Sequence, residues 1–376
     1  LDKSVSLDQT NPAREGQCHH SPSNSFNVAV DQCTQCLTAI SVLLSACGRA
    51  VRNSRIIGGQ DATPGSWSWH ALVVTYGPYG YKQCGGSLIT NQWVLTAARC
   101  IPISSNNTVV HLGRYNQSGL NPNEVTQKVK ETICHPAFSF YCWTYENDIC
   151  LLKLSAPVNF TDYIQPICLA SEKSTFHNGT SSRVTGFGYD DSYRFSNILQ
   201  EVNVPILGNN ECRCHFENYY YYYWLPQITE NVTCTGPKVG WKGPFYGDEG
   251  EPLMIKAGSL WVQSGVQSYS YGCGGLSIYT RVSQYQKWIS DTVTGTPPGF
   301  VTFSSPGTDS DLNFTCPTSP PPSYNIFYDN VSISNPLFPS TDGSVFGSSE
   351  NLFHLTHVTS LCVLVALLHA FVVSGM

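Results

Sequence analysis

Three carboxylates stand close together in the stretch GDEGEP (247–252), which follows a glycine- and proline-rich run and precedes an apolar one. Asp248, Glu249 and Glu251 carry the functional group of a general acid or base, and a carboxylate can also be the nucleophile in glycoside chemistry. On a peptide bond, a carboxylate nucleophile would form an anhydride and would still need a base. The stretch therefore offers carboxylate chemistry but no hydroxyl nucleophile.

A cation and a further carboxylate stand in two other motif-like segments, Arg99 in TAARC (96–100) and Asp148 in NDICLLKL (147–154). Arg99 cannot act as a general base near pH 7, because the pKa of a guanidinium lies above about 12. If the fold brings these segments together, Arg99 can pair with Asp148 and reach Glu249, and such a network would satisfy the charges without doing catalysis. The alternative is that these side chains are exposed and unpaired.

Metal binding is a further alternative, because spare cysteines could combine with His19, His20 or His135. No CxxC…HxxxH spacing supports such a site. We therefore expect no metal and no cofactor.

The composition indicates a secreted, disulfide-bonded protein. The 376 residues include 16 cysteines, which is typical of an oxidising compartment. The net charge of −6 argues against a nucleic-acid partner. N-x-S/T sequons agree with secretion, and they begin at Asn106, Asn116, Asn159, Asn178, Asn231, Asn313 and Asn330.

The elements that must position these groups are mostly short strands. Runs rich in Val, Leu, Ile, Thr and Tyr alternate with Gly, Asn and Pro turns, as in HALVVTY, GGSLIT, QWVLTAA, SSRVTGFGY and SIYTRV. The best helical signal is YQKWISDTV (285–293). Many short strands over residues 56–293 predict an all-β domain, either paired antiparallel barrels or a sandwich.

This segment resembles the trypsin-like (S1, chymotrypsin-fold) serine protease family, particularly its tryptase and testisin-like membrane-anchored branch. The resemblance rests on RIIGG, TAARC, NDICLLKL, YIQPICL, VTGFG, GDEGEP and IYTRVSQYQKWI, which match the family's motifs in order and spacing. It implies two six-stranded antiparallel β-barrels with a cleft between them, ending in a short C-terminal helix. It also implies a serine endopeptidase, which acts through a serine, a histidine and an aspartate.

The chain departs from the family at the catalytic positions. Arg99 stands where the family has histidine, Glu249 stands where it has serine, and only Asp148 is kept. The family's oxyanion hole uses the amides that correspond to Gly247 and Glu249, where the three nearby carboxylates oppose a developing oxyanion. We therefore expect a catalytically inactive homologue.

The specificity pocket departs as well. Its base falls at Gly243 or Pro244, without a carboxylate for a basic side chain. Its two wall glycines correspond to Ser270 and Ser277, whose side chains should narrow it. Phe245 replaces a pocket cysteine, which leaves Cys273 without its family partner.

The resemblance also implies an activation site and a set of disulfides. Cleavage after Arg55 would free the amine of Ile56, which in the family pairs with the carboxylate corresponding to Asp248. The implied disulfides are Cys84–Cys100, Cys212–Cys234 and Cys47–Cys168, and Cys134 and Cys150 flank a hairpin and could pair. The pairing of Cys142, Cys214 and Cys273 stays open.

The aromatic run Tyr219–Trp224 borders the cleft in the family. Tyrosine and tryptophan are enriched in binding surfaces, so the run could contact a protein partner. The alternative is an inserted loop that packs on its own barrel.

Both ends differ in composition from the domain. Residues 1–55 combine a doubtful N-terminus, a signal-like stretch (37–46) and a propeptide, and residues 294–350 read as a disordered Pro/Ser/Thr-rich stalk. Residues 351–376 form a hydrophobic C-terminal anchor signal, preceded by small residues near Gly347 and Ser348 that suit lipid attachment. Alternatives for the tail are a transmembrane anchor or a buried helix.

The leading hypothesis is an inactive trypsin-like homologue, displayed outside the cell at its surface, that binds a protein partner through its cleft or the aromatic run. One rival is an endopeptidase with residual or unconventional activity through Glu249. Another is a decaying gene product that folds poorly. The sequence does not indicate an oligomeric state.

Overall fold

The computed structural model describes residues 47–52, 60–77, 80–102, 107–138, 146–189, 194–219, 227–236, 244, 246–271 and 275–317. Several predicted features lie outside these residues: the signal-like stretch, Arg55 and Ile56, Asn106, Cys142, residues 220–224 of the aromatic run, Gly243, Phe245, Cys273, Asn330, and everything from residue 318 onward, including Gly347 and Ser348. For these, the sequence-based statements stay predictions.

Six antiparallel strands form a closed N-terminal barrel in the order β2-β3-β4-β7-β6-β5. The strands are β2 (His70–Gly77), β3 (Gly80–Leu88), β4 (Trp93–Thr96), β5 (Thr108–Leu112), β6 (Val125–Cys134) and β7 (Cys150–Leu154). β5 alternates buried and half-buried residues along its length, as expected where one face of a barrel wall is inside.

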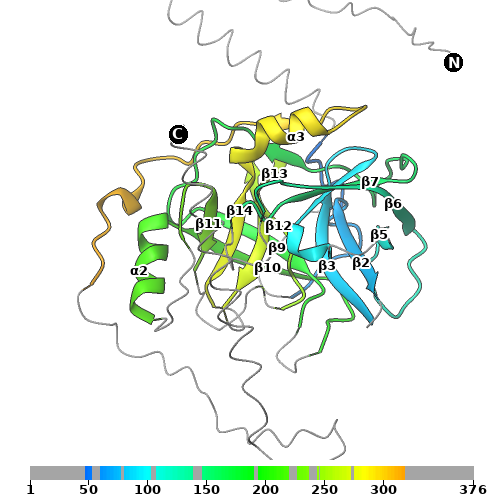
Figure 1. The fold of residues 1–376 in the computed structure, drawn as a ribbon, viewed down its shortest axis with the longest axis horizontal. Coiled ribbons are helices and arrows are strands. Elements are labelled where there is room, and N and C mark those ends of the chain that lie inside the picture. Colours follow the sequence, from blue (N-terminus) through cyan, green and yellow to red (C-terminus); the bar gives the residue numbers. More distant parts are fainter. Residues whose placement is uncertain are drawn as a thin grey trace, which may run out of the picture. The chain divides into compact units, whose positions relative to one another are not determined.

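A second barrel follows in the chain, with the order β12-β9-β10-β11-β14-β13, and the pairing of β12 with β13 closes it (Figure 1). Its strands are β9 (Ser181–Gly186), β10 (Gln200–Leu207), β11 (Val232–Thr235), β12 (Pro252–Ala257), β13 (Leu260–Ser270) and β14 (Ser277–Arg281), and the short β1 (Gln60–Asp61) pairs with β10. The predicted pair of six-stranded antiparallel barrels is confirmed.

One hydrophobic core joins the two barrels. Trp69 and Leu95 of the first barrel region belong to the same buried cluster as Met254 and Val266 of the second. Polar contacts also cross between them: the indole nitrogen of Trp69 lies 2.9 Å from Met254 Sδ, and Ser87 donates to Gln263 over 2.6 Å. Because apolar burial is the main favourable term in folding, this shared core fixes the barrels against one another.

Helices are few, as the sequence predicts. α3 (Gln286–Thr292) lies within the predicted helical stretch and follows the 3-10 turn η2 (Val282–Tyr285). A second helix, α2 (Asn209–Tyr219), was not expected, because its sequence NNECRCHFENY is polar and lacks a clear apolar repeat. Cys212 and Phe216 nevertheless attach it to a small core with β11 and β14.

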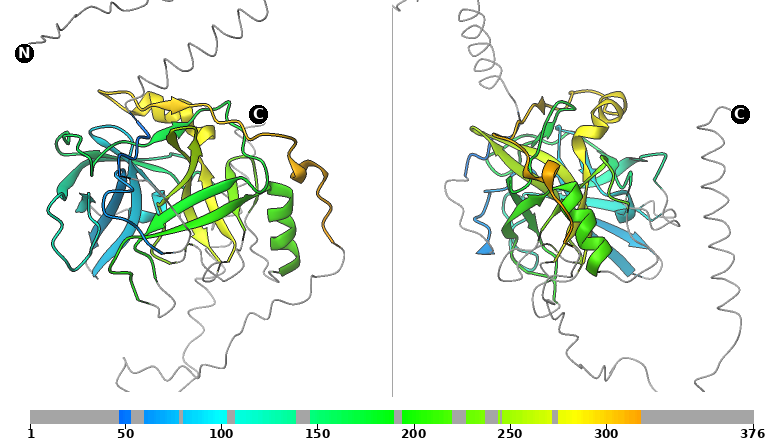
Figure 2. Two further views of the ribbon diagram at one scale, coloured as in Figure 1. Left: turned by 180° about the vertical axis from the view of Figure 1, so that it is seen from behind. Right: turned by 90° about the vertical axis from the view of Figure 1, so that its left-hand side faces the viewer.

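The structure differs from the expectation at the start of the predicted stalk. Residues 294–317, here called the C-terminal strap, run along the second barrel to α2 (Figures 1 and 2). They contain β15 (Phe300–Val301) and the 3-10 turn η3 (Ser310–Asn313). β15 pairs in parallel with β8 (Cys168–Ala170), so the strap orders itself by adding a strand to an existing sheet. The strap therefore needs no hydrophobic core of its own.

The end of the strap holds α2. Asp311 is buried, and its two carboxylate oxygens accept the amides of Asn210 at 2.8 Å and Glu211 at 2.9 Å. These are amides that a helix N-terminus leaves without intrahelical partners. Cys214 of α2 then forms a disulfide with Cys316 at the strap's end. The strap and α2 are therefore one packed unit.

Five disulfides lie within the described ranges. Four are the pairs that the sequence led us to expect, Cys47–Cys168, Cys84–Cys100, Cys134–Cys150 and Cys212–Cys234. The fifth, Cys214–Cys316, gives one of the unassigned cysteines a partner in the predicted stalk. No helix in the part of the chain described here is long and apolar enough to cross a membrane.

Candidate functional site

Arg99 and Asp148 form a tight ion pair. Arg99 lies in the 3-10 turn η1 (Ala98–Cys100), and Asp148 lies two residues before the start of β7. Arg99 Nε donates to Asp148 Oδ2 over 2.5 Å, and the Arg99 amide donates to Oδ1 over 2.9 Å. The Asp148 side chain is fully buried, whereas the Arg99 side chain keeps 18% of its surface exposed. The predicted ion pair between Arg99 and Asp148 is therefore present.

Two hydroxyls that the sequence reasoning missed complete the surroundings of Asp148. Ser268 donates to its Oδ2 over 2.6 Å, and Thr280 donates to its backbone carbonyl over 2.9 Å. Both come from strands more than 100 positions along the chain. A buried carboxylate with an arginine, an amide and a hydroxyl as donors is well satisfied.

Glu249 turns back onto its own loop. The loop bends at Gly247 (φ 95°) and Gly250 (φ 87°), a conformation that only glycine adopts freely. The amide of Gly247 donates to Glu249 Oε2 over 3.0 Å, and the side chain is largely buried. Gly247 is the residue whose amide the resemblance assigns to an oxyanion hole. That donor is thus bound to a carboxylate of the chain itself, and the expected contact of Glu249 with Arg99 stays a prediction.

Lys82 is a further charged group that the sequence reasoning missed. Its Nζ donates to the carbonyl of Arg99 over 3.0 Å from the adjacent strand β3. Burial lowers the pKa of Lys82, and the nearby charge of Arg99 lowers it further, whereas Glu249 and Asp148 act in the opposite direction. Lys82 therefore lies close enough to Arg99, Asp148 and Glu249 for all three to affect its pKa.

Aromatic side chains line the same region. The guanidinium of Arg99 lies 5.8 Å from the ring centre of Tyr269, within the range of a cation–π contact. Tyr269 packs edge-to-face on Tyr271, which packs in turn on Phe216 of α2. A series of aromatic contacts therefore leads from Arg99 to α2.

The two serines at the pocket walls bond to each other. Ser270 Oγ and Ser277 Oγ lie 2.8 Å apart, and Gln267 donates to Ser270 over 3.0 Å. Ser277 is fully buried. The two hydroxyls thus occupy space that two glycines would leave open, and the narrowing of a specificity pocket stays a prediction. Of the two candidates for the pocket base, Pro244 is described and buried.

Asp248 is held in a space that only glycines permit. Its Oδ1 accepts the amide of Gly188 over 2.8 Å. A Cβ added at Gly186 or at Gly188 would lie 2.0 Å and 2.3 Å from the carboxylate oxygens, closer than side-chain carbons approach. The carboxylate is thus enclosed in the loop region, while its expected role in receiving the Ile56 amine stays a prediction.

Glu251 forms a buried pair that no sequence argument anticipated. Its Oε1 lies 2.9 Å from His70 Nε2, and both side chains are almost entirely buried. Gly85 makes the space, since a Cβ there would lie 2.2 Å from the Glu251 carboxyl carbon. Burial raises the pKa of Glu251 well above its usual value. Burial lowers the pKa of His70 to about 4, against the opposing effect of Asp248.

No three His, Cys, Asp or Glu side chains gather as metal ligands among the residues whose placement is described. None of the groups found next to Asp148, namely Arg99 and Ser268, combines an activated nucleophile with a base of suitable pKa.

Known proteins resemble the chain over the barrels. Residues 56–289 match the family model described as Trypsin. Human (Homo sapiens) testisin is 35% identical over 262 residues, which cover 66% of this chain and 81% of testisin. Bovine (Bos taurus) coagulation factor XI is 34% identical over 248 residues, which cover 64% of this chain but only 38% of factor XI.

Proposed function

Because the chain belongs to the trypsin-like serine protease family, we propose that it is a catalytically inactive member that acts by binding a protein partner. The single observation that carries the proposal is the contact between the Gly247 amide and the Glu249 carboxylate. Peptide hydrolysis in this family needs that amide for a developing oxyanion and needs a hydroxyl at the position of Glu249. Here Glu249 removes the hydroxyl nucleophile, and its carboxylate occupies the amide of Gly247.

The position of Arg99 supports the same conclusion. The family's histidine accepts a proton from the nucleophile and returns it to the leaving group. A guanidinium stays protonated at all relevant pH values, and here its Nε is already bonded to Asp148. The network has a structural role: it keeps a fully buried carboxylate paired.

The full chain is expected to be inert toward serine-directed reagents and peptide substrates. A fluorophosphonate probe should label trypsin but not this protein, and fluorogenic peptides ending in Arg, Phe or Ala should show no turnover above a heat-denatured control. Restoring Arg99→His and Glu249→Ser together should still give a poor enzyme, because the side chains of Ser270 and Ser277 are expected to narrow the pocket. Turnover by the wild-type chain that disappears in Glu249→Ala would instead support the rival, a peptidase with unconventional chemistry.

The partner surface that we propose is the cleft around Arg99 and residues 246–251. Tyr246 is 62% exposed and directly precedes Gly247, and the ring centre of Tyr269 lies 5.8 Å from the guanidinium of Arg99. Tyrosine and arginine are enriched at protein interfaces. A photoreactive amino acid at position 246 should therefore crosslink a protein on intact cells, whereas one at the exposed Leu312 of η3 should not. Equal crosslinking from both positions would place the partner surface elsewhere.

An extracellular position at a cell surface, held by a lipid, is the environment that we propose. The disulfides support an oxidising compartment. Phosphatidylinositol-specific phospholipase should release the protein from cells. Retention of a protein that still carries a tag after Gly375 would favour a transmembrane tail.

A further inference from the structure

Asn178 is a sequon residue whose side chain contacts three elements of the fold. It begins the stretch N-G-T (178–180), a pattern that accepts an N-linked sugar. Its Oδ1 accepts the amide of Gly208, directly after β10, over 3.3 Å. Its Nδ2 donates to Glu211 of α2 over 2.8 Å and to Ser310 of the strap over 3.4 Å. One carboxamide therefore links the barrel, the helix and the strap.

The backbone at Asn178 also meets the strap end, here defined as residues 305–317. The Asn178 amide donates to Asp309 Oδ1 over 3.0 Å. Two residues later, Asp311 accepts the first amides of α2. Gly208 makes room for that contact, since a Cβ there would lie 2.0 Å from the Asp311 carboxyl carbon. The contacts that dock the strap end therefore converge around Asn178.

An N-linked sugar would change Asn178 at the atom that makes two of these contacts. The transfer joins Nδ2 to the first carbon of the sugar and breaks the bond from that carbon to the diphosphate of a lipid-linked oligosaccharide, and one amide hydrogen leaves as a proton. A carboxamide nitrogen carries only two hydrogens, so one of its two bonds is lost. An N-linked sugar is also bulky, and Glu211 and Ser310 occupy the space beside Nδ2. A sugar at Asn178 is therefore incompatible with the docked strap end.

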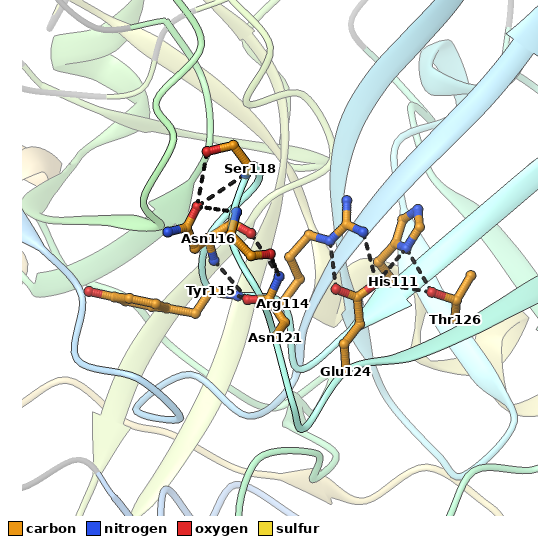
Figure 3. A network of polar contacts seen from close by, with 9 residues as sticks. His111, Arg114, Tyr115, Asn116, Ser118, Asn121, Glu124 and Thr126 are labelled. Carbon is orange, nitrogen blue, oxygen red and sulfur yellow. Dashed lines mark hydrogen bonds and ion pairs between the residues drawn. The ribbon is translucent and has the colours of Figure 1, made fainter.

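Asn116 is a sequon residue with the opposite surroundings (Figure 3). It begins the stretch N-Q-S (116–118), and its Oδ1 accepts the amides of Ser118 over 3.1 Å and Gly119 over 2.8 Å. Its Nδ2 has no hydrogen-bond partner among the described residues and points away from the labelled side chains of Figure 3. Ser118 is exposed. A sugar on Asn116 would therefore break none of these contacts.

The order of synthesis gives a sugar access to Asn178 before the strap exists. The strap begins at residue 294, about 100 residues further along the chain. A growing chain gains about 5–20 residues per second, so the sequon precedes the strap by about 5–20 s. During that interval no part of the strap covers Nδ2. Chains that receive a sugar and chains that do not therefore meet their own strap with different side chains at position 178.

We propose that an N-linked sugar on Asn178 and a docked strap end exclude each other, whereas Asn116 carries its sugar in either case. The bare form keeps the contacts of Asp311 with α2, and the glycosylated form loses them. Because α2 ends at Tyr219, the first residue of the aromatic run, this release extends to the start of that run. The sequon at Asn178 thus acts as a switch on the strap, and it does not depend on the proposed loss of activity.

The test compares two measurements on the full chain secreted from animal cells. Glycopeptide mass spectrometry gives the fraction of molecules with a sugar at Asn178. Hydrogen exchange of α2 gives the fraction in which the amides of Asn210 and Glu211 exchange fast, and these two populations stay separate because the bare and glycosylated molecules do not interconvert. The two fractions should be equal, and fast exchange should exceed slow exchange about tenfold or more. The same chain from a bacterial periplasm, which forms disulfides but attaches no such sugar, should show only the slow population.

Two variants provide the controls. Ser118→Ala removes the open sequon at Asn116 and should leave the fast fraction of α2 unchanged. Asp311→Ala removes the carboxylate that holds α2 and should make every molecule exchange fast, with or without a sugar.

Each outcome decides for or against the proposal. Slow exchange of α2 in molecules that carry a sugar at Asn178 would overturn it, and so would a bare Asn116 in the secreted protein. If Asn178 is bare in every wild-type molecule, the docked strap must be what excludes the sugar. Asp311→Ala combined with Cys316→Ser should then acquire it, and a sequon that stays bare in this double variant would contradict the proposal.

Discussion

Replacing Arg99 with leucine is expected to lower the free energy of unfolding by about 3 kcal/mol, because breaking a buried ion pair leaves an uncompensated charge. The affected charge is that of Asp148, whose side chain is fully buried. Ser268 and the backbone amide of residue 99 still donate to it, which keeps the loss near the lower end of the usual range. Urea denaturation of both proteins at pH 7 measures the difference. We expect a fall in melting temperature of about 6–12 °C.

Two further variants separate the charge from the packing. Arg99→Lys keeps a cation and should cost less than the leucine variant. Adding Asp148→Asn to Arg99→Leu removes the uncompensated charge and should restore part of the stability. A surface substitution usually changes the free energy of unfolding by no more than about 0.5 kcal/mol. If Arg99→Leu differs from the wild type by no more than this, the ion pair does not support the fold.

Glu251→Gln is expected to stabilise the protein at alkaline pH. The folded-state pKa of Glu251 is raised by burial, so its contribution to stability is fully present below the unfolded value of about 4.5 and is lost as pH rises toward the folded value. Each unit between the two values costs about 1.4 kcal/mol. Glutamine has nearly the same shape, can donate to His70 Nε2 and does not ionise. Its melting temperature should exceed that of the wild type by about 3 °C or more at pH 8.

The same pair limits stability on the acid side through His70. Its pKa falls from 6.5 in the unfolded state to about 4 in the folded state. The unfolded chain therefore takes up a proton first as pH falls, and stability is lost between about 6.5 and 4. The advantage of Glu251→Gln should shrink between pH 8 and pH 5, because the cost of ionising Glu251 disappears as pH falls, whereas the loss through His70 affects both proteins. The exposed Glu217 provides the control, since Glu217→Gln should melt like the wild type at both pH values. A wild type more stable than Glu251→Gln at pH 8 would contradict the assignment.

The strands could be predicted from the sequence because their causes are local. Strand-like runs and turn residues alternate along residues 56–293. These runs left paired barrels and a sandwich open, and the resemblance implied the barrels. The resemblance also implied that Arg99 and Asp148 meet, and their opposite charges then predict the ion pair. It implied three of the disulfides, whereas Cys134–Cys150 was suggested by the hairpin that these two cysteines flank.

The parts that could not be predicted depend on long-range contacts. His70 and Glu251 are 181 positions apart, and Ser268 and Asp148 are 120 positions apart. The composition of the strap predicts a disordered stalk, because a segment rich in Pro, Ser, Thr and Gly cannot form a hydrophobic core by itself. Its order comes from partners elsewhere, through parallel pairing with β8 and the bond from Cys316 to Cys214. The composition of a segment indicates whether it can fold alone, but it does not show whether other parts of the chain hold it in place.

The contact between Ser270 and Ser277 couples what each of these positions can become. Replacing Ser277 with glycine removes one partner of a hydrogen bond and leaves a gap next to Ser270. Replacing Ser270 with glycine leaves the fully buried hydroxyl of Ser277 without that partner, at a cost of about 1–3 kcal/mol. Each single replacement is therefore expected to lower stability, whereas the double replacement removes both hydroxyls together. A chain with two glycines is thus harder to reach through either single change than through both at once.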